Sequence, residues 1–261
     1  MKKYKIIMFI GDYMLKLELL DNKIFKEAFD SISKIVDEVV CDVDSDGFHV
    51  TAIDRSHICF VELNLEPSVF EEFECSKPER LCIDTQEFMR ILKRAKKNDV
   101  LRLSSDEGNL IISFIGDVDR TFKIKLIDMD YESPKAPAIE LPCGVNVDSG
   151  LIKDAIGDME LFSDKLYFLI NPEYFIVNSD GEFGDASFQY LHGENGISET
   201  VKSSFSINKL KDIFTASKFS DIVNINLGTD MPMIVDFELI TGDGDLKFLL
   251  APRIEAEEEY E

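Results

Sequence analysis

Basic side chains are scarce in this sequence, because 28 Lys and Arg stand against 51 Asp and Glu and give a formal net charge of -23. A charge of that sign repels nucleic acid from the molecule as a whole, so any contact with DNA requires a locally positive surface. The composition therefore excludes a uniformly basic DNA-binding protein and leaves a local cluster of basic residues as the candidate.

Long apolar runs are also missing. None approaches the roughly 18 consecutive apolar residues of a membrane-spanning helix. The N-terminal run IIMFI is short and is not followed by a signal-peptide cleavage site. We therefore expect a cytoplasmic protein with no membrane partner. With 261 residues, 45% of them hydrophobic, the chain can bury a core as one large domain or as two of about 100 to 150 residues.

The cysteines show no pattern of pairing. They are odd in number and include no C-x-x-C pair, which argues against a disulfide framework and against a zinc site. The five positions are Cys41, Cys59, Cys75, Cys82 and Cys143. We expect buried, reduced thiols.

Catalytic motifs are absent as well. The sequence contains no G-x-S-x-G, no G-x-x-x-x-G-K and no H-E-x-x-H, and it has only three histidines. His49 and His192 fit ordinary strand and loop positions. An acidic pair such as Glu182 and Asp185 is more typical of a charged turn than of a metal site. We predict that the protein is not an enzyme and needs no metal or cofactor.

One acidic stretch, DVDSDG from Asp42 to Gly47, matches the first half of a calcium-binding EF-hand loop. That loop also needs a bidentate glutamate at its twelfth position, where this sequence has Ile53. The segments on both sides alternate apolar and polar residues, as strands do. The stretch is therefore predicted to be a hairpin turn.

An internal repeat organises the chain. The segment from Lys26 to Ala52 matches the segment from Lys153 to Ser179, and each predicts an amphipathic helix followed by two strands and a turn. A second pair, residues 91–103 and 213–225, carries a helix into a strand in both copies. The sequence therefore predicts two similar halves, each with two helices among many short strands.

The segment from Asp128 to Pro142 separates the halves. Its three prolines, Pro134, Pro137 and Pro142, exclude a helix and favour an extended strap. We therefore predict a first domain over residues 14–127, a connector over 128–142 and a second domain over 143–254. The like-charge run over residues 255–261 is expected to be a disordered tail.

The segment RILKRAKK, Arg90 to Lys97, holds most of the local positive charge. If this segment and the residues just before it form a helix, the helix has an apolar face and a basic face. The apolar face consists of Phe88, Ile91, Leu92 and Ala95. The basic face consists of Arg90, Lys93, Arg94 and Lys97. A solvated surface face is the plain alternative. In so acidic a chain, however, such a face would be expected to mix signs, and no Asp or Glu interrupts this segment.

Four further motifs carry a resemblance to a known family. They are DRSH (Asp54 to His57), IKLIDMDYESP (Ile124 to Pro134), GEFGDASFQY (Gly181 to Tyr190) and FLLAPRIEAEEE (Phe248 to Glu259). In this order they resemble the sliding clamp of DNA replication, the proliferating cell nuclear antigen (PCNA) family, most closely its archaeal members. The resemblance covers Met14 to Glu261. It implies an α+β clamp fold of two similar domains, each with two helices packed on antiparallel sheets.

The resemblance also implies a function. Three subunits of such a clamp close head to tail into a ring that encircles duplex DNA, with the helices lining the hole. The basic residues expected to face the phosphates are Lys26, Arg90, Lys93, Arg94, Lys97, Lys153, Lys209, Lys211 and Lys218. Acidic residues interrupt the other helices, so we expect an unevenly positive channel, weak affinity for DNA and retention by topology. Phosphate contacts carry no sequence information, which suits a sliding protein.

On the outside, the family binds the PIP-box peptides of its clients, in which a glutamine is followed by an aliphatic and two aromatic residues. By resemblance the pocket comprises Ile53, His57, Ile58, Phe60, Pro134, Ala136, Pro137, Leu141, Pro232, Leu249, Leu250, Ala251 and Pro252. The implied partners are DNA polymerase, clamp loader, flap endonuclease, DNA ligase and other PIP-box proteins.

The subunit interface is expected to pair an edge strand at Asp117 to Lys125 with one at Phe183 to Leu191. Its strand-forming residues are Phe122, Ile124, Phe183, Phe188 and Tyr190, and an unpaired edge of that kind is an aggregation hazard. The sequence leaves open whether three identical subunits or paralogous subunits form the ring.

Residues 1–13 have no counterpart in the family. We expect either that Met14 is the true initiator or that these residues form a floppy extension. Two other functions remain open: an acidic scaffold with a clamp fold that never closes on DNA, and a hydrolase that uses a carboxylate-bound metal. A processivity assay on primed circular DNA with clamp loader separates the first from a clamp, and metal-dependent turnover would indicate the second.

Overall fold

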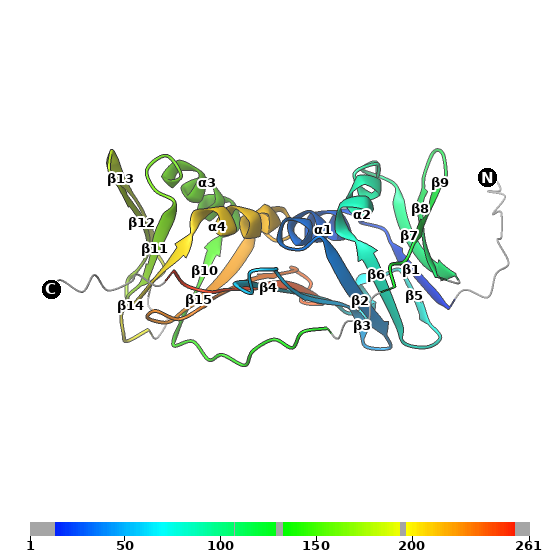
Figure 1. Ribbon diagram of the computed structural model, residues 1–261, viewed down its shortest axis with the longest axis horizontal. Helices are drawn as coiled ribbons and strands as arrows, with labels where there is room; N and C mark the ends of the chain where they lie inside the picture. Colours follow the sequence, from blue (N-terminus) through cyan, green and yellow to red (C-terminus); the bar gives the residue numbers. More distant parts are fainter. Residues whose placement is uncertain (1–13, 107, 129–132, 194–196, 254–261) are drawn as a thin grey trace.

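The computed structural model describes residues 14–106, 108–128, 133–193 and 197–253. The predicted N-terminal extension and the predicted acidic tail lie outside the described residues. Figure 1 shows an elongated molecule with a broad central sheet, a smaller sheet at each end, helices on one side and the strap on the other. Among the helices of the described ranges, none is long and apolar enough to cross a bilayer.

The two halves of the chain contain matching series of elements. The first half contains β1 (Leu15–Leu19), α1 (Lys23–Ile35), β2 (Glu38–Asp44), β3 (Gly47–Ile53), β4 (Cys59–Leu65), the short 3-10 helix η1 (Pro67–Val69), β5 (Glu72–Cys75), β6 (Glu79–Asp84), α2 (Thr85–Leu92), β7 (Val100–Asp106), β8 (Asn109–Ile115) and β9 (Arg120–Lys125). The second half contains β10 (Cys143–Asp148), α3 (Ser149–Met159), β11 (Lys165–Ile170), β12 (Tyr174–Gly181), β13 (Gly184–Leu191), β14 (Val201–Ser206), α4 (Ile207–Ile213), the 3-10 helix η2 (Phe214–Lys218), β15 (Ile222–Leu227), β16 (Met233–Glu238) and β17 (Gly244–Leu250).

The strands form three antiparallel sheets. Their orders are β5-β1-β7-β8-β9, β10-β15-β16-β17-β4-β3-β2-β6 and β13-β12-β11-β14. In the second of these, β17 of the second half pairs with β4 of the first half, from Gly244 opposite Leu65 to Leu250 opposite Cys59. The central eight-stranded sheet is therefore shared by the two halves. The predicted α+β architecture, with two helices in each half packed on antiparallel sheets, is confirmed.

The acidic stretch that resembles half of an EF-hand loop is a hairpin turn between β2 and β3. The amide nitrogen of Asp46 donates to the Asp44 carboxylate at 2.8 Å, which closes the turn between the paired strands. A strand, not a second helix, follows it. In the second copy, α3 is likewise followed by the antiparallel pair β11 and β12, so the helix-then-hairpin prediction is correct for both copies of the repeat.

Alternation along the strands of the central sheet sorts side chains onto two faces. One face is apolar and packs under the helices. The other, which we call the outer face, lies away from the helices, on the side of the strap (Figure 1). In β3, for example, Phe48, Val50 and Ala52 are buried, whereas His49 and Thr51 are half-buried on the outer face.

Phenylalanines fill much of the space between helix α1 and the sheet. The ring centroids of Phe25 and Phe48 lie 4.9 Å apart, and those of Phe29 and Phe88 lie 4.8 Å apart, both in edge-to-face arrangements. Such pairs contribute about 0.5 to 1.5 kcal/mol beyond the burial of their area. These contacts fix α1 and α2 against one another on the same face of the molecule.

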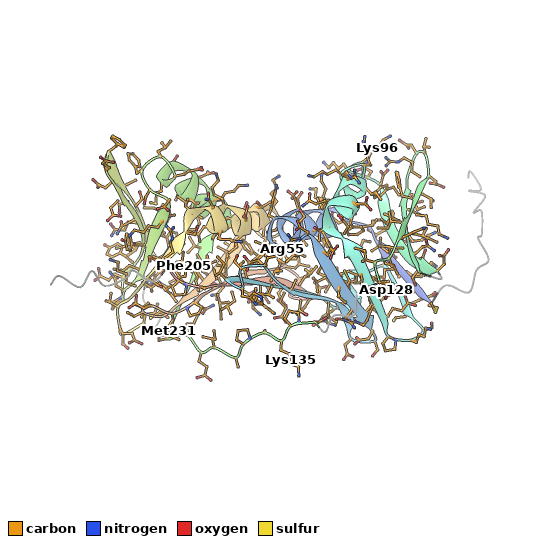
Figure 2. The ribbon with its side chains drawn as sticks, viewed as in Figure 1. Arg55, Lys96, Asp128, Lys135, Phe205 and Met231 are labelled. Atoms are coloured by element: carbon orange, nitrogen blue, oxygen red, sulfur yellow. The ribbon has the colours of Figure 1, made fainter. Side chains whose placement is uncertain are left out.

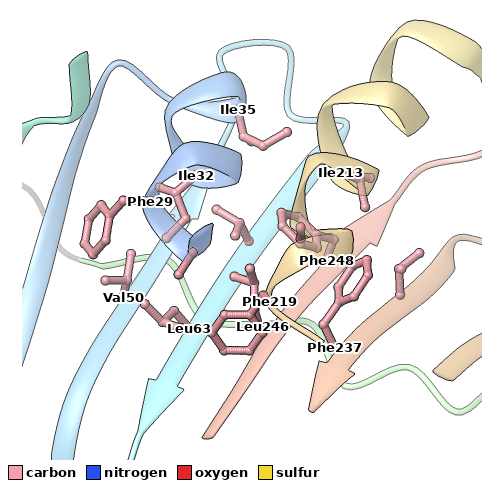
Figure 3. Packing of buried hydrophobic residues seen from close by; sticks show 14 of the residues in the cluster. Phe29, Ile32, Ile35, Val50, Leu63, Ile213, Phe219, Phe237, Leu246 and Phe248 are labelled. Carbon is pink, nitrogen blue, oxygen red and sulfur yellow. The ribbon is translucent and has the colours of Figure 1, made fainter. Parts of the chain in front are cut away.

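The two halves also meet through their helices. The Ser31 hydroxyl of α1 lies 3.2 Å from the carbonyl oxygen of Asp212 and 3.3 Å from that of Ile213, both in α4. Figure 3 shows Ile35 of α1 and Ile213 of α4 above a layer that includes Leu63 and Phe248 from the two halves of the sheet. One continuous core therefore joins both halves, and the helices form a row across its top.

Candidate DNA-facing and peptide-binding surfaces

The helical face carries the basic residues singled out in the sequence. Lys26 lies on α1, Arg90 on α2, Lys153 on α3, and Lys209 and Lys211 on α4, with Lys218 at the end of η2. Because the four helices gather between the two end sheets (Figure 1), these residues belong to one face of the molecule. Acidic residues of the same helices lie among them, so the charge on this face is mixed.

Helix α2 is shorter than the sequence predicted. It ends at Leu92, and two short turns follow, at residues 93–94 and 97–98; we call Lys93 to Lys97 the basic turn. The Asn22 side-chain amide, from the start of α1, donates to the carbonyl oxygens of Lys96 at 3.0 Å and Asp99 at 2.6 Å. The Asp99 carboxylate accepts from the amide nitrogen of Lys96 at 2.8 Å. These polar contacts hold the segment that follows the helix (Figure 2 labels Lys96).

Several of the predicted DNA-contacting residues are engaged in ion pairs. Arg90 pairs with Glu87 at 3.0 Å, Lys93 with Asp30 at 3.6 Å, and Lys211 with Glu160 at 2.6 Å. These pairs are largely solvent-exposed and therefore weak. No carboxylate within the described ranges pairs with Lys26, Arg94, Lys97, Lys153 or Lys218.

Lys209 differs from the other basic residues of the helical face. Its ammonium donates to the Asp54 carboxylate at 2.6 Å, and its side chain is 23% exposed while that of Asp54 is 3% exposed. The predicted DNA contact of Lys209 is thus at odds with its position, because its charge is turned toward the loop after β3 and is already compensated there.

That loop, residues 54–58, is organised around the Asp54 carboxylate. One oxygen accepts from the amide nitrogens of Ile58 at 2.8 Å and Cys59 at 3.0 Å, and the other accepts from the Ser56 hydroxyl at 2.7 Å and from Lys209. Burial alone raises the pKa of Asp54, but these donors outweigh it and lower the pKa to about 2. The loop therefore contains a carboxylate that stays charged at neutral pH.

The last described residues of the chain are fixed beside this loop. The amide nitrogen of Ala251 donates to the carbonyl oxygen of Ile58 at 2.8 Å. Further on, the amide nitrogen of Arg253 donates to the Ser204 carbonyl oxygen at 2.8 Å, and the Ser204 hydroxyl donates back to the Arg253 carbonyl at 3.0 Å. Loop and chain ending thus form one edge of the outer face.

An apolar row crosses the outer face next to that edge. Ile53 lies opposite Phe60, Phe60 opposite Leu249, and Leu249 opposite Ile234, on four neighbouring strands. Sequence reasoning found three members of this row but missed Ile234. The signal was available, because Ile234 alternates with the buried Met233 and Val235 in β16 and so had to face outward.

The remaining residues of the predicted peptide pocket divide by burial. Leu250 lies on the inner face of β17 and is 1% exposed, so it belongs to the core and its place in the predicted pocket is wrong. Phe60 is buried at 6%. The half-buried members are Ile53, Pro134, Leu141, Pro232, Leu249, Ala251 and Pro252, and the exposed members are His57, Ile58, Ala136 and Pro137. The strap passes on the outer side of the sheet (Figure 1), where the Ser133 hydroxyl donates to Asp42 at 2.8 Å.

Each end sheet has two edge strands among the described strands: β5 and β9 in one, and β13 and β14 in the other. The prediction concerns β9 and β13. The predicted interface residues Phe122, Ile124, Phe188 and Tyr190 lie on these strands and are half-buried. The predicted ranges were too long at their starts. Residues 117–119 form the turn before β9, and Phe183, 91% exposed, precedes β13.

A chain of two matching α+β halves that share a central sheet and carry the four described α-helices on one face has a clamp fold. The family model described as "Proliferating cell nuclear antigen, N-terminal domain" matches residues 14–134, and the corresponding C-terminal model matches residues 135–253. The chain belongs to the proliferating cell nuclear antigen family. The predicted family and clamp fold are confirmed.

Relatives of known name agree with this assignment. The chain is 52% identical to the DNA polymerase sliding clamp of Methanobrevibacter smithii, over 94% of this chain and 100% of that protein. It is 49% identical to the DNA polymerase sliding clamp of Methanothermobacter thermautotrophicus over the same shares. The solved structure of the C-terminal region of FEN-1 bound to A. fulgidus PCNA aligns with a TM-score of 0.85 and 27% identity, covering 94% of this chain and 100% of that one.

Proposed function

We propose that this protein is a DNA sliding clamp: a ring-forming, non-enzymatic processivity factor that encircles duplex DNA and tethers replication and repair proteins. The observation that carries the proposal is the joint between the two halves of the chain. Because the halves repeat one another, the pairing of β17 with β4 has a counterpart that a single copy leaves unmade. That counterpart is the pairing of β9 with β13.

The matching ladders make this counterpart specific. Strand β9 follows β8 as β17 follows β16, and β13 follows β12 as β4 follows β3. In the joint within the chain, Leu249 lies opposite Phe60. By the matching ladders, Lys123 in β9 is the counterpart of Leu249, and Asp185 in β13 is the counterpart of Phe60. The same register between two copies therefore sets Lys123 of one copy opposite Asp185 of the next. Opposite charges in such a cross-strand pair are favourable.

The helices support the same head-to-tail arrangement. Within the chain α1 packs against α4, and their counterparts are α3 and α2. Asp158 on α3 is the counterpart of Ser31, and Arg90 on α2 is the counterpart of Asp212, whose carbonyl Ser31 approaches. An acidic α3 would then meet Arg90 of α2 across the subunit boundary. A cavity of about 250 Å³ beneath Arg90, Ile91 and Phe122 lies where the next copy would dock.

A contact of this kind uses different surfaces on the two partners, so it closes into a ring when the rotation permits. In the proposed trimer the helical faces line the hole. Lys26, Lys153, Lys218 and the basic turn then meet phosphates, and such contacts are independent of base sequence. Arg90, one of the residues predicted from the sequence to contact DNA, is proposed instead to contact α3 of the next copy at the subunit boundary. The mixed charge of the face agrees with weak affinity and retention by enclosure.

Clients would bind the outer face. The apolar row, the loop at residues 54–58 and the chain ending offer neighbouring half-buried side chains below an extended strap, a suitable surface for the aromatic anchors of a PIP-box peptide. The FEN-1 segment bound to the archaeal relative supports flap endonuclease as one such client. DNA polymerase, DNA ligase and the clamp loader are proposed on the same basis.

Native mass measurement combined with a processivity assay tests the ring. We expect a trimeric mass at micromolar concentration and longer extension products on primed circular DNA with clamp loader. Ile124→Pro, which puts a residue without an amide hydrogen into β9, should reduce both. A folded monomer without a partner subunit would contradict the ring, whereas a paralogous subunit that restores the trimer would indicate a heterotrimer. Normal client binding without any gain in processivity would favour the scaffold that never encloses DNA.

A further inference from the structure

We propose that Lys209 is a positioning residue for the peptide-binding surface and not a contact for DNA: from the helical face it holds the loop that borders the apolar row. The inference rests on the proposed client-binding function of the outer face. It assigns to one lysine of α4 an effect on the opposite side of the sheet.

The connection runs through three consecutive contacts. The Lys209 ammonium donates to the Asp54 carboxylate at 2.6 Å. The other oxygen of that carboxylate accepts from the amide nitrogen of Ile58 at 2.8 Å. The Ile58 carbonyl then accepts from the amide nitrogen of Ala251 at 2.8 Å. A side chain of the helix layer is thereby linked to both parts of the edge that borders the apolar row.

The loop depends on these polar contacts because packing supports it poorly. A cavity of about 330 Å³ lies against it, lined by Ile53, Asp54, Ser56 and Lys209 together with residues 35–40 at the end of α1 and the start of β2. His57 adopts a positive φ of 57°, an uncommon conformation for a residue other than glycine. With apolar support missing on one side, the hydrogen bonds of Asp54 determine where Ile58 and His57 lie.

Loss of the lysine would leave the Asp54 carboxylate buried without its cation. Such a charge is strongly unfavourable, so the loop is expected to move until water reaches the carboxylate. That movement displaces the Ile58 amide and carbonyl together and so disturbs the Ala251 contact. The apolar row itself stays in place, because cross-strand pairing fixes it.

Lys211 provides a matched control. It lies on the same helix, and its ammonium pairs at 2.6 Å with Glu160, where both side chains are 44% exposed. Lys209→Met and Lys211→Met remove the same charge from the same face. If both lysines act only on DNA, the two variants should behave alike.

The experiment titrates a fluorescent PIP-box peptide against wild type and both variants, with thermal melting as the folding control. We expect Lys209→Met to weaken binding roughly tenfold, the effect of losing one charge-assisted hydrogen bond, and Lys211→Met to change it less than about twofold. Lys209→Arg, which keeps a cation for Asp54, should restore most of the affinity. If Lys209→Met does not fold, Lys209→Gln replaces it in the same comparison.

Hydrogen exchange separates positioning from a general loss of stability. The amides of Ile58 and Cys59 should exchange faster in Lys209→Met, while amides in the middle of β4 keep their protection. Equal peptide affinity in Lys209→Met and wild type overturns the inference, as does a loss of affinity with unchanged loop exchange. Wild-type protein that binds no peptide overturns the client-binding function itself, which is a different result. A defect confined to DNA loading would return Lys209 to the DNA-contacting set.

Discussion

Ile53 and Ala251 border the proposed peptide surface from two sides, one in the apolar row and one in the chain ending. Both are half-buried, and neither belongs to the buried core. An aspartate at either position puts a charge where an anchor side chain would be desolvated. We expect Ile53→Asp or Ala251→Asp to reduce PIP-box peptide affinity by on the order of thirtyfold, about 2 kcal/mol, in a fluorescence titration.

Thr51→Asp is the control for this prediction, because Thr51 lies two residues from Ile53 on the same face of β3, in a polar part of the sheet. It should bind nearly as well as wild type. Undiminished binding in both folded test variants would show that the peptide surface has been assigned to the wrong residues.

A second prediction at this scale concerns pH. Burial raises the pKa of Asp236; Asp245 and Glu238 add to this, and Lys247 opposes it in part. One oxygen of Asp236 is buried without a hydrogen-bond partner in the described structure. The folded state therefore binds this proton more tightly than the unfolded state, so stability should rise as pH falls from neutral toward the raised pKa.

Asp236→Asn tests this expectation by urea unfolding between pH 7 and pH 5. The amide keeps the shape but removes the charge, so the variant should be more stable than wild type at pH 7, on the order of 1 kcal/mol. Its advantage should shrink as pH falls. An advantage that grows on acidification, or a variant less stable at pH 7, would be the opposite of this result.

At the scale of elements, the edge strands β9 and β13 carry the proposed ring. Lys123→Asp sets two acidic side chains opposite each other in the transferred register and should shift the trimer toward monomer. Asp185→Lys alone should do the same, and the double variant should recover much of the trimer. Cross-strand charge pairs contribute about 0.2 to 1 kcal/mol, so dilution series by analytical ultracentrifugation are the suitable measurement.

Lys123 also pairs with Asp106 of its own copy at 2.7 Å, so each single variant needs a thermal melt as a control. The register is refuted if the double variant is no better than the sum of the two single variants.

The basic turn after α2 gives a prediction about DNA. Lys97→Glu should weaken clamp retention on DNA at low salt, and the difference should fade as salt rises. The dependence of the logarithm of affinity on the logarithm of salt should lose about one unit of slope per phosphate contact removed. Lys135→Glu makes the same change on the strap, on the other side of the molecule (Figure 2), and should have little effect. Equal effects of the two variants would mean that only the net charge matters.

The sequence predicted those helices and strands whose pattern of apolar residues can be recognised within the segment itself. Alternation in β3 and β4, and the repeat of helix and hairpin, were sufficient for the fold class, and strand alternation also places the apolar row. The segment after α2 was not predictable from its own residues, because the amide that bonds its Lys96 carbonyl comes from Asn22, far away in the chain. The partner of Lys209 was hidden for the same reason: Asp54 is 155 residues distant.

At the scale of the whole molecule, the charge distribution predicts how DNA is held. A body with a net charge of -23, whose helical face carries scattered basic side chains without a carboxylate partner among the described residues, should bind weakly but remain on DNA that it encloses. Loaded clamps should therefore stay on closed circular DNA during gel filtration and leave soon after a restriction enzyme linearises it. Equal retention on both forms would mean that surface attraction, not enclosure, holds the protein.

The shared central sheet has one more consequence, for the mechanics of the proposed ring. We call the pairing of β17 with β4 the seam within the chain. The strap connects the same two halves covalently, so if this seam opens, its two strands stay at high effective concentration and pair again quickly. The seam between copies has the same kind of ladder but no tether. Of two nearly equal seams, the one without a covalent tether is therefore where the proposed ring should part under strain, and only its formation from separate copies depends on protein concentration.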